Sequence, residues 1–166
     1  VVALSGARVP LRLVATDAGD NPVPWDPAQL EVTAARTRGA GLLAAHYEGD
    51  CLRLSGAPGT GRVQFRLPGI AGAATVEVTL QAVCPRLEVL LPAQALRAGQ
   101  TYTLQAVGVG DHDEPLWLPP AAVQWQGEGV VVSRSGRFTA GEAGSTARVR
   151  ATCGEALAEA TVAVGK

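Results

Sequence analysis

The sequence predicts an all-β protein built as two tandem Greek-key β-sandwiches. The chain of 166 residues is 47% hydrophobic, with 4% aromatic residues, no Met and 20 Gly, a composition that suits short strands joined by tight turns. Apolar residues alternate with polar ones, and turn residues recur about every eight to twelve positions, as in β-sandwiches. The third observation is an internal repeat that covers nearly the whole chain.

The repeat divides the chain into residues 1–82 and 83–166. Up to position 33 the two copies match at an offset of 93, and from position 57 they match at an offset of 86. The matched pairs include Gly6 with Gly99, Leu11 with Leu104, Val14 with Val107, Asp20 with Asp113, Pro22 with Pro115, Val63 with Val149, and Ala74–Val76 with Ala160–Val162. One loop, longer in the first copy between positions 34 and 49, reconciles the two offsets. Each copy, with about 80 residues, can hold one small core.

In the first copy the predicted elements follow one another as short strands and turns. They are a strand over Val9–Ala15, a turn over Asp17–Val23, a strand at Leu30 and Val32, a long irregular stretch with Arg36, Gly39 and Gly41, a strand at Leu52 and Leu54, a turn over Gly56–Gly61, and strands over Val63–Leu67 and Val76–Leu80. In the turn, Asp and Asn side chains bond the backbone and tolerate positive φ, while Pro22 directs the exit.

The second copy repeats this order. Its predicted strands are Tyr102–Ala106, Val123 with Trp125, Val130 with Val132, Phe138 with Ala140, Ala147–Cys153, and Val162 with Val164. An apolar lead-in over Leu87–Leu91 has no counterpart before Gly6. Because the chain also begins at Val1 without a Met or a signal peptide, we expect a fragment of a longer protein, with the first strand of domain 1 truncated.

Charge is balanced in each half, with seven Arg against seven acidic residues in 1–82 and seven basic against eight acidic residues in 83–166. This balance argues against nucleic acid or an anionic membrane as a partner. No apolar run approaches the roughly 20 residues that span a bilayer, so membrane insertion of these residues is not expected.

The segment Leu13–Val23, together with Gly136, Phe138–Ala140 and Gly144, resembles the bacterial immunoglobulin-like (Ig-like) domains. The second copy matches that pattern nearly throughout, including Trp125, whereas Val32 stands in the first copy where the pattern has Trp. The resemblance implies tandem Ig-like sandwiches in a secreted or cell-surface bacterial protein, beside adhesins or appended to secreted enzymes such as phosphodiester glycosidase-like proteins. The neighbouring domains of that parent protein would be the partners.

An Ig-like topology places the first strand of a domain beside the last. It therefore implies that Cys84, at the start of the second copy, lies near Cys153 in the loop before the last strand, and that the two form a disulfide. Cys51 would then remain reduced. The alternative is three buried free thiols, because Cys packs as a small apolar residue.

Residues with catalytic chemistry are sparse, and the sequence predicts neither an enzyme nor a cofactor. His46 and His112 stand alone, without further ligands at metal-binding spacing. The glycines of Gly56–Arg62 lack the Lys-Ser/Thr pair of a phosphate-binding loop, and Ser133 and Ser135 have no neighbouring base.

Asp111, Asp113 and Glu114 form an acidic cluster whose oxygen atoms suit Ca²⁺. The matching positions of the first copy are Ala18, Asp20 and Asn21, so only one carboxylate is shared. Stabilisation of the turn is the favoured interpretation, and no metal site is predicted.

Trp25 and Trp117 lie in proline-flanked loops one position apart in the repeat, and are candidates for stacking on a sugar. Packing of their rings over the edge of a domain is the alternative. Trp125 alternates with Val123 and is expected in the core. Three hypotheses follow: a structural spacer or accessory module, which the sequence favours, a carbohydrate-binding module that would bind a cell-envelope glycan, and a protein-adhesion module with an exposed sheet edge.

Overall fold

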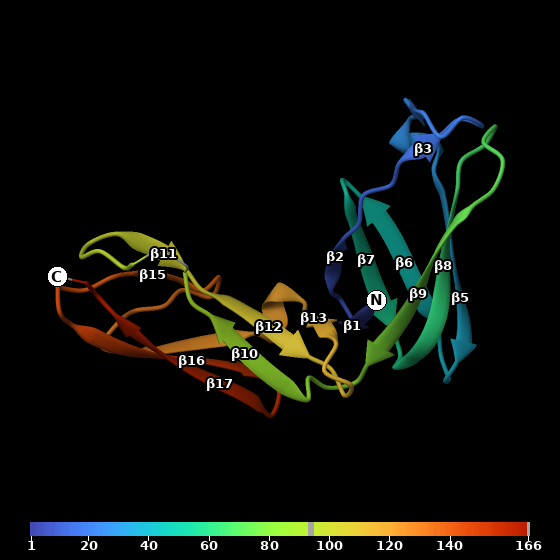
Figure 1. Ribbon diagram of the computed structural model, residues 1–166. Helices are drawn as coiled ribbons and strands as arrows, with labels where there is room; N and C mark the ends of the chain where they lie inside the picture. Colours follow the sequence, from blue (N-terminus) through green and yellow to red (C-terminus); the bar gives the residue numbers. More distant parts are fainter. Residues whose placement is uncertain (93–94, 166) are drawn as a thin grey trace. The chain divides into compact units, whose positions relative to one another are not determined.

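The computed structural model describes residues 1–92 and 95–165 (Figure 1). The described chain is all-β, with two one-turn 3₁₀ helices, η1 (Pro27–Gln29) and η2 (Pro120–Ala122), as its helical elements. It divides into two compact units, Val1–Ala82 and Val83–Lys166, here called unit 1 and unit 2.

Unit 1 is a sandwich of two sheets. One sheet has the order β1-β9-β8-β5 and the other the order β2-β7-β6, while β3 and β4 form a short hairpin. The strands are β1 (Val2–Leu4), β2 (Arg8–Pro10), β3 (Ala15–Thr16), β4 (Pro22–Val23), β5 (Glu31–Arg38), β6 (Leu43–Glu48), β7 (Cys51–Gly56), β8 (Gly59–Arg66) and β9 (Ala74–Gln81). The first strand, β1, pairs in parallel with the last, β9. This connectivity between two sheets is that of an Ig-like Greek-key sandwich.

Unit 2 repeats the arrangement. In one layer, β12 pairs with β10 and with β13, and β11, which only Leu104 separates from β12, pairs with β15. The other layer has the order β14-β16-β17. The strands are β10 (Arg86–Leu90), β11 (Thr101–Thr103), β12 (Gln105–Val109), β13 (Pro115–Trp117), β14 (Gln124–Glu128), β15 (Arg137–Thr139), β16 (Thr146–Cys153) and β17 (Ala156–Ala163). An isolated parallel bridge joins Leu96 to Val164, at the place where β1 pairs with β9 in unit 1.

The strand registers confirm the offset of 93 in the first part of the repeat and 86 in the middle. Val9 pairs with Leu52 in unit 1 as Tyr102 pairs with Phe138 in unit 2. The last strand differs from the expectation. Val63 faces Val76 in unit 1, whereas Val149 faces Ala160 in unit 2.

The last strands therefore correspond at an offset of 84, and the match of Ala74–Val76 with Ala160–Val162 is wrong by two positions. A shift of two residues keeps the same side chains facing the core, since side chains on a strand alternate with period two. Val78 and Leu80 are buried in unit 1 as Val162 and Val164 are in unit 2.

Each unit has its own hydrophobic core, to which both of its sheets contribute. In unit 1 the most deeply buried large side chains include Leu52 and Leu54 from one sheet and Val63, Val78 and Leu80 from the other. In unit 2 the core contains Tyr102, Leu104, Phe138, Val149 and Val162, with Trp125 packed against it.

At one pair of facing core positions, the larger side chain lies on one strand in unit 1 and on the other strand in unit 2. Val32 lies opposite Phe65 in unit 1, and at the same register Trp125 lies opposite Ala151 in unit 2. A large side chain on one strand is matched by a small one on its neighbour in both units, as dense core packing requires. This pairing explains why unit 1 lacks the tryptophan of the pattern.

Two expectations for unit 1 are corrected. The strand predicted over Val9–Ala15 is interrupted, because residues 11–14 between β2 and β3 belong to no strand. The stretch expected to be irregular contains the end of β5 and all of β6, whose side chains alternate weakly in polarity. Arg36 lies within β5, and its guanidinium donates hydrogen bonds to the carbonyl oxygens of Leu42 and Ala57, which joins two turns at one end of the unit.

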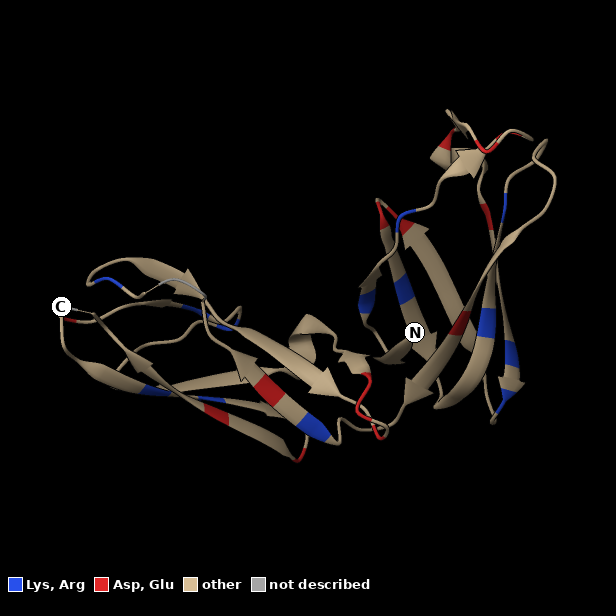
Figure 2. Ribbon diagram, in the orientation of Figure 1, with Lys and Arg blue, Asp and Glu red and all other residues tan. Residues whose placement is uncertain are grey.

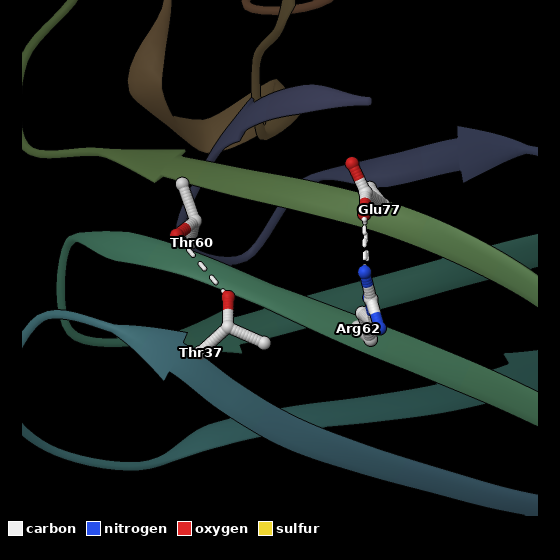
Figure 3. A network of polar contacts seen from close by, with 4 residues as sticks. All are labelled: Thr37, Thr60, Arg62 and Glu77. Carbon is white, nitrogen blue, oxygen red and sulfur yellow. Dashed lines mark hydrogen bonds and ion pairs between the residues drawn. The ribbon is translucent and has the colours of Figure 1, made fainter.

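Polar residues pair across the outer face of the β5-β8-β9 sheet (Figure 3). Arg62 Nη2 lies 3.1 Å from Glu77 Oε1, and the hydroxyl groups of Thr37 and Thr60 are 3.3 Å apart. Figure 2 shows the charged positions dispersed along the strands and turns of both units. Exposed ion pairs of this kind contribute little stability each, so the two cores carry the fold.

Candidate functional site

The two cysteines of unit 2 lie close together. Cys84 precedes β10, Cys153 ends β16, both are buried, and each lies close enough to affect the pKa of the other. The Cys84 thiol also donates to the Arg86 carbonyl oxygen, at 3.0 Å. Because β10 contacts both β16 and β17, the topology brings together residues that are far apart in the sequence.

Both thiols are held in their neutral form. Burial first, and the neighbouring Cys84 thiol second, raise the pKa of Cys153 to about 11. Burial also raises the pKa of Cys84, an effect that the hydrogen bonds to its thiol partly offset. Cys51, half-buried at the start of β7, belongs to the other unit, and all three cysteines carry free thiols in the structure. Nucleophilic chemistry by Cys84 and Cys153 is disfavoured, since the thiolate is the reactive form.

Trp25 lines a groove of about 400 Å³ in unit 1. The groove opens between the segment Leu13–Thr16 and the connection from β8 to β9, and Phe65 lies among its lining residues. Sequence reasoning singled out Trp25 but not the groove.

The other two tryptophans lie in unit 2. Trp117 ends β13, and 39% of its surface is exposed. Trp125 on β14 packs against the core, as expected, and a Cβ atom at Gly136 would come within 3.2 Å of its ring. The structure therefore does not bring Trp25 and Trp117 into one site within a unit.

The acidic cluster of unit 2 forms a turn between β12 and β13. Asp113, at a φ of 61°, makes an ion pair of 3.0 Å with Arg86, and the Glu114 carboxylate accepts a hydrogen bond of 2.9 Å from the His112 backbone N–H. Among the residues that the structure describes, no three His, Cys, Asp or Glu side chains are arranged to hold a metal ion. The contacts of Asp113 and Glu114 are those of a stabilised turn.

The equivalent turn of unit 1 is built by Asp17. Its carboxylate accepts hydrogen bonds from the backbone N–H groups of Gly19, at 2.8 Å, and Asn21, at 3.0 Å. These hydrogen bonds lower the pKa of Asp17 below its ordinary value, and the bond from Asn21 has the largest effect. This confirms the predicted use of Asp in the turn, and the side chain is committed to the backbone rather than to a ligand.

The two serines of unit 2 line an open hollow of about 1000 Å³. Their hydroxyl groups are 3.0 Å apart, and the Ser133 hydroxyl accepts a hydrogen bond of 3.1 Å from the Arg137 backbone N–H. Ser133 and Ser135 thus close the turn before β15. His46, on β6, lies in the other unit.

No family profile and no curated protein matches this chain. Among solved structures, domains 1–6 of the surface layer protein SbsC match with 17% identity and a TM-score of 0.38, over 97% of this chain and 25% of that one. The titin segment A168–A169 matches with 17% identity and a TM-score of 0.32, over 99% of this chain and 93% of that one. The D0–D1 domain of intimin matches with 15% identity and a TM-score of 0.29, over 99% and 84%.

The chain spans a quarter of the length of the SbsC structure that it matches. At these identities and TM-scores, the assignment of an Ig-like sandwich rests on the strand order of the chain itself. No helix among the described residues is both long and apolar enough to cross a bilayer.

Proposed function

We propose that this chain is a non-catalytic tandem module that acts as a spacer or accessory region of a larger secreted or cell-surface bacterial protein. The observation that carries this proposal is that each unit has a core shared by its own two sheets. Residues 1–82 and 83–166 are then two Ig-like domains of the bacterial type, each of which orders its own polypeptide. Such domains set the distance between the parts of a protein that they connect.

The connection between the units supports the same role. β9 ends at Gln81 and β10 begins at Arg86, so four residues join the two units. One of them is Pro85, whose ring fixes φ and reduces the freedom of the connection. A connection of four residues that includes a proline is stiffer than a flexible Gly/Ser linker.

Small-angle X-ray scattering tests the spacer role. We expect the full chain to give a narrower distribution of interatomic distances than a variant with Pro85→Gly and a Gly/Ser insertion after Ala82. An insertion elsewhere, at the exposed Gly72 in the connection from β8 to β9, serves as the matched control. Equal distributions for the chain and the linker variant would contradict the role.

Carbohydrate binding is the second candidate, because Trp117 is exposed and Trp25 lines a groove. Aromatic rings of this kind provide apolar faces for stacking. Quenching or a shift of tryptophan fluorescence on a panel of cell-envelope glycans would support it, provided that Trp25→Ala or Trp117→Ala removes the response. Leu42→Ala, at a residue that is 85% exposed, is the control for an unrelated surface change.

We also propose that Cys84 and Cys153 form a disulfide in the secreted protein. The contact between the two buried side chains supports it. Oxidation joins the two sulfur atoms and removes two protons and two electrons, which a disulfide-bonded oxidoreductase or a small-molecule disulfide accepts by thiol–disulfide exchange. Cys51 stays reduced.

A further inference from the structure

The strand β5 lies at the edge of its sheet in unit 1. It pairs with β8 on one side, and no strand of the described chain pairs with it on the other. With eight residues, Glu31–Arg38, it is longer than the equivalent edge strand of unit 2, β14, which has five. Backbone groups of successive residues in a strand point alternately to its two sides, so half of those in β5 point to the open edge.

Few features of β5 prevent it from pairing with another strand. Edge strands are commonly protected by a short length, by Pro or Lys, or by a bulge. β5 contains neither Pro nor Lys, and it stays in regular register with β8 from Glu31 to Arg36, with its irregularity between Arg36 and Arg38. The side chains at its centre, Thr33–Ala35, are small, so a second backbone can approach closely.

The two ends of β5 carry opposite charges on the outer face of the sheet. Val32 packs against the core, so its neighbour Glu31 faces outward. At the other end Arg38 lies opposite Thr60, whose hydroxyl is 3.3 Å from that of Thr37 on the outer face (Figure 3). Glu31 and Arg38 are both exposed, and neither belongs to an ion pair within the described chain.

These charges make β5 complementary to itself in an antiparallel pair. A two-fold axis through Ala34 places Ala34 opposite Ala34 of a second copy, and Glu31 opposite Thr37. Because Thr37 and Arg38 both lie on the outer face at the irregularity, each Glu31 then lies beside Arg38 of the second copy. A two-fold interface repeats every contact, so two such charge pairs form.

We propose that unit 1 dimerises through β5, by antiparallel pairing with β5 of a second copy. The two β1-β9-β8-β5 sheets then form one continuous sheet across the interface. Backbone hydrogen bonds supply the affinity, and the Glu31–Arg38 pairs set the register. The contact is confined to one strand edge and includes exposed charges, so the association is weak and decreases with added salt. It requires unit 1 alone and does not depend on the spacer role.

Sedimentation equilibrium of the full chain over a wide range of concentration tests the proposal. We expect a monomer–dimer equilibrium whose Kd rises by about tenfold or more in Glu31→Arg and in Arg38→Glu, since like charges then meet at two places. The double variant Glu31→Arg/Arg38→Glu should restore the original Kd. Glu155→Arg makes the same change of charge at an exposed turn residue of unit 2 and should leave the Kd unchanged.

Amide hydrogen exchange locates the contact. On concentrating the chain, exchange at alternate residues of β5 should slow, and Glu31→Arg should remove this effect. Dispersed amide spectra of each variant show that it is folded. A chain that stays monomeric at every concentration would overturn the proposal, as would a Kd that the charge reversals leave unchanged, or protection that appears at β14 or β6 instead of β5.

Discussion

Loss of the proposed Cys84–Cys153 disulfide should destabilise unit 2 by a magnitude that follows from the sequence separation. The bridge would close a loop of about 69 residues, for which loop-closure entropy predicts about 4 kcal/mol at 25 °C. With a urea m-value of about 2 kcal/mol/M for a domain of this size, the unfolding midpoint should fall by about 2 M on reduction. Trp125, packed against the core of unit 2, reports the transition by fluorescence.

The experiment uses protein secreted through an oxidising compartment, measured with and without reductant. A Cys51→Ser variant should show the same response to reductant, because its thiol belongs to the other unit. A Cys84→Ala/Cys153→Ala variant should be insensitive to reductant and as stable as the reduced protein within about 1 to 2 kcal/mol, the usual cost of such a truncation. Three thiols alkylated in denaturant without reductant, or one midpoint under both conditions, would refute the reasoning.

Three further predictions concern single contacts. Trp125→Val should lower the unfolding free energy of unit 2 by about 3 kcal/mol, as measured in urea, and adding Ala151→Phe should recover part of that loss. If the free-energy effects of the two substitutions simply add, the two positions do not compensate for each other's volume. Arg36→Ala should cost unit 1 about 2 kcal/mol, because two turn carbonyls lose a charged donor; an unchanged midpoint would exclude that role. The Asp17 carboxyl has a lowered pKa, so its contribution to stability is present above its unfolded value, 3.8, and is lost as the pH falls through the lower folded value. NMR titration should place that pKa below 3.8, and Asp17→Ala should reduce the loss of stability in acid.

Local sequence patterns determined the fold class, the two units and most strands of the protein. Alternation at Val63 and Phe65, and the Asp-rich turns, depend on neighbours within a few residues, and the structure has them where they were predicted. The repeat added non-local information, because conserved spacing placed Val32 and Trp125 at one register. Sequence also predicted that Cys84 and Cys153 approach each other, although only through the topology that the resemblance implied.

Tertiary structure decided what local patterns leave open. The weakly alternating segment of β6 becomes a strand because β7 supplies its hydrogen-bond partners, and the last strand shifts by two positions because either register buries the same face. The groove beside Ala15 is likewise invisible locally, since its walls come from segments that lie far apart in the sequence. Side-chain alternation is a property of each segment, whereas pairing, register and cavities are properties of segments brought together.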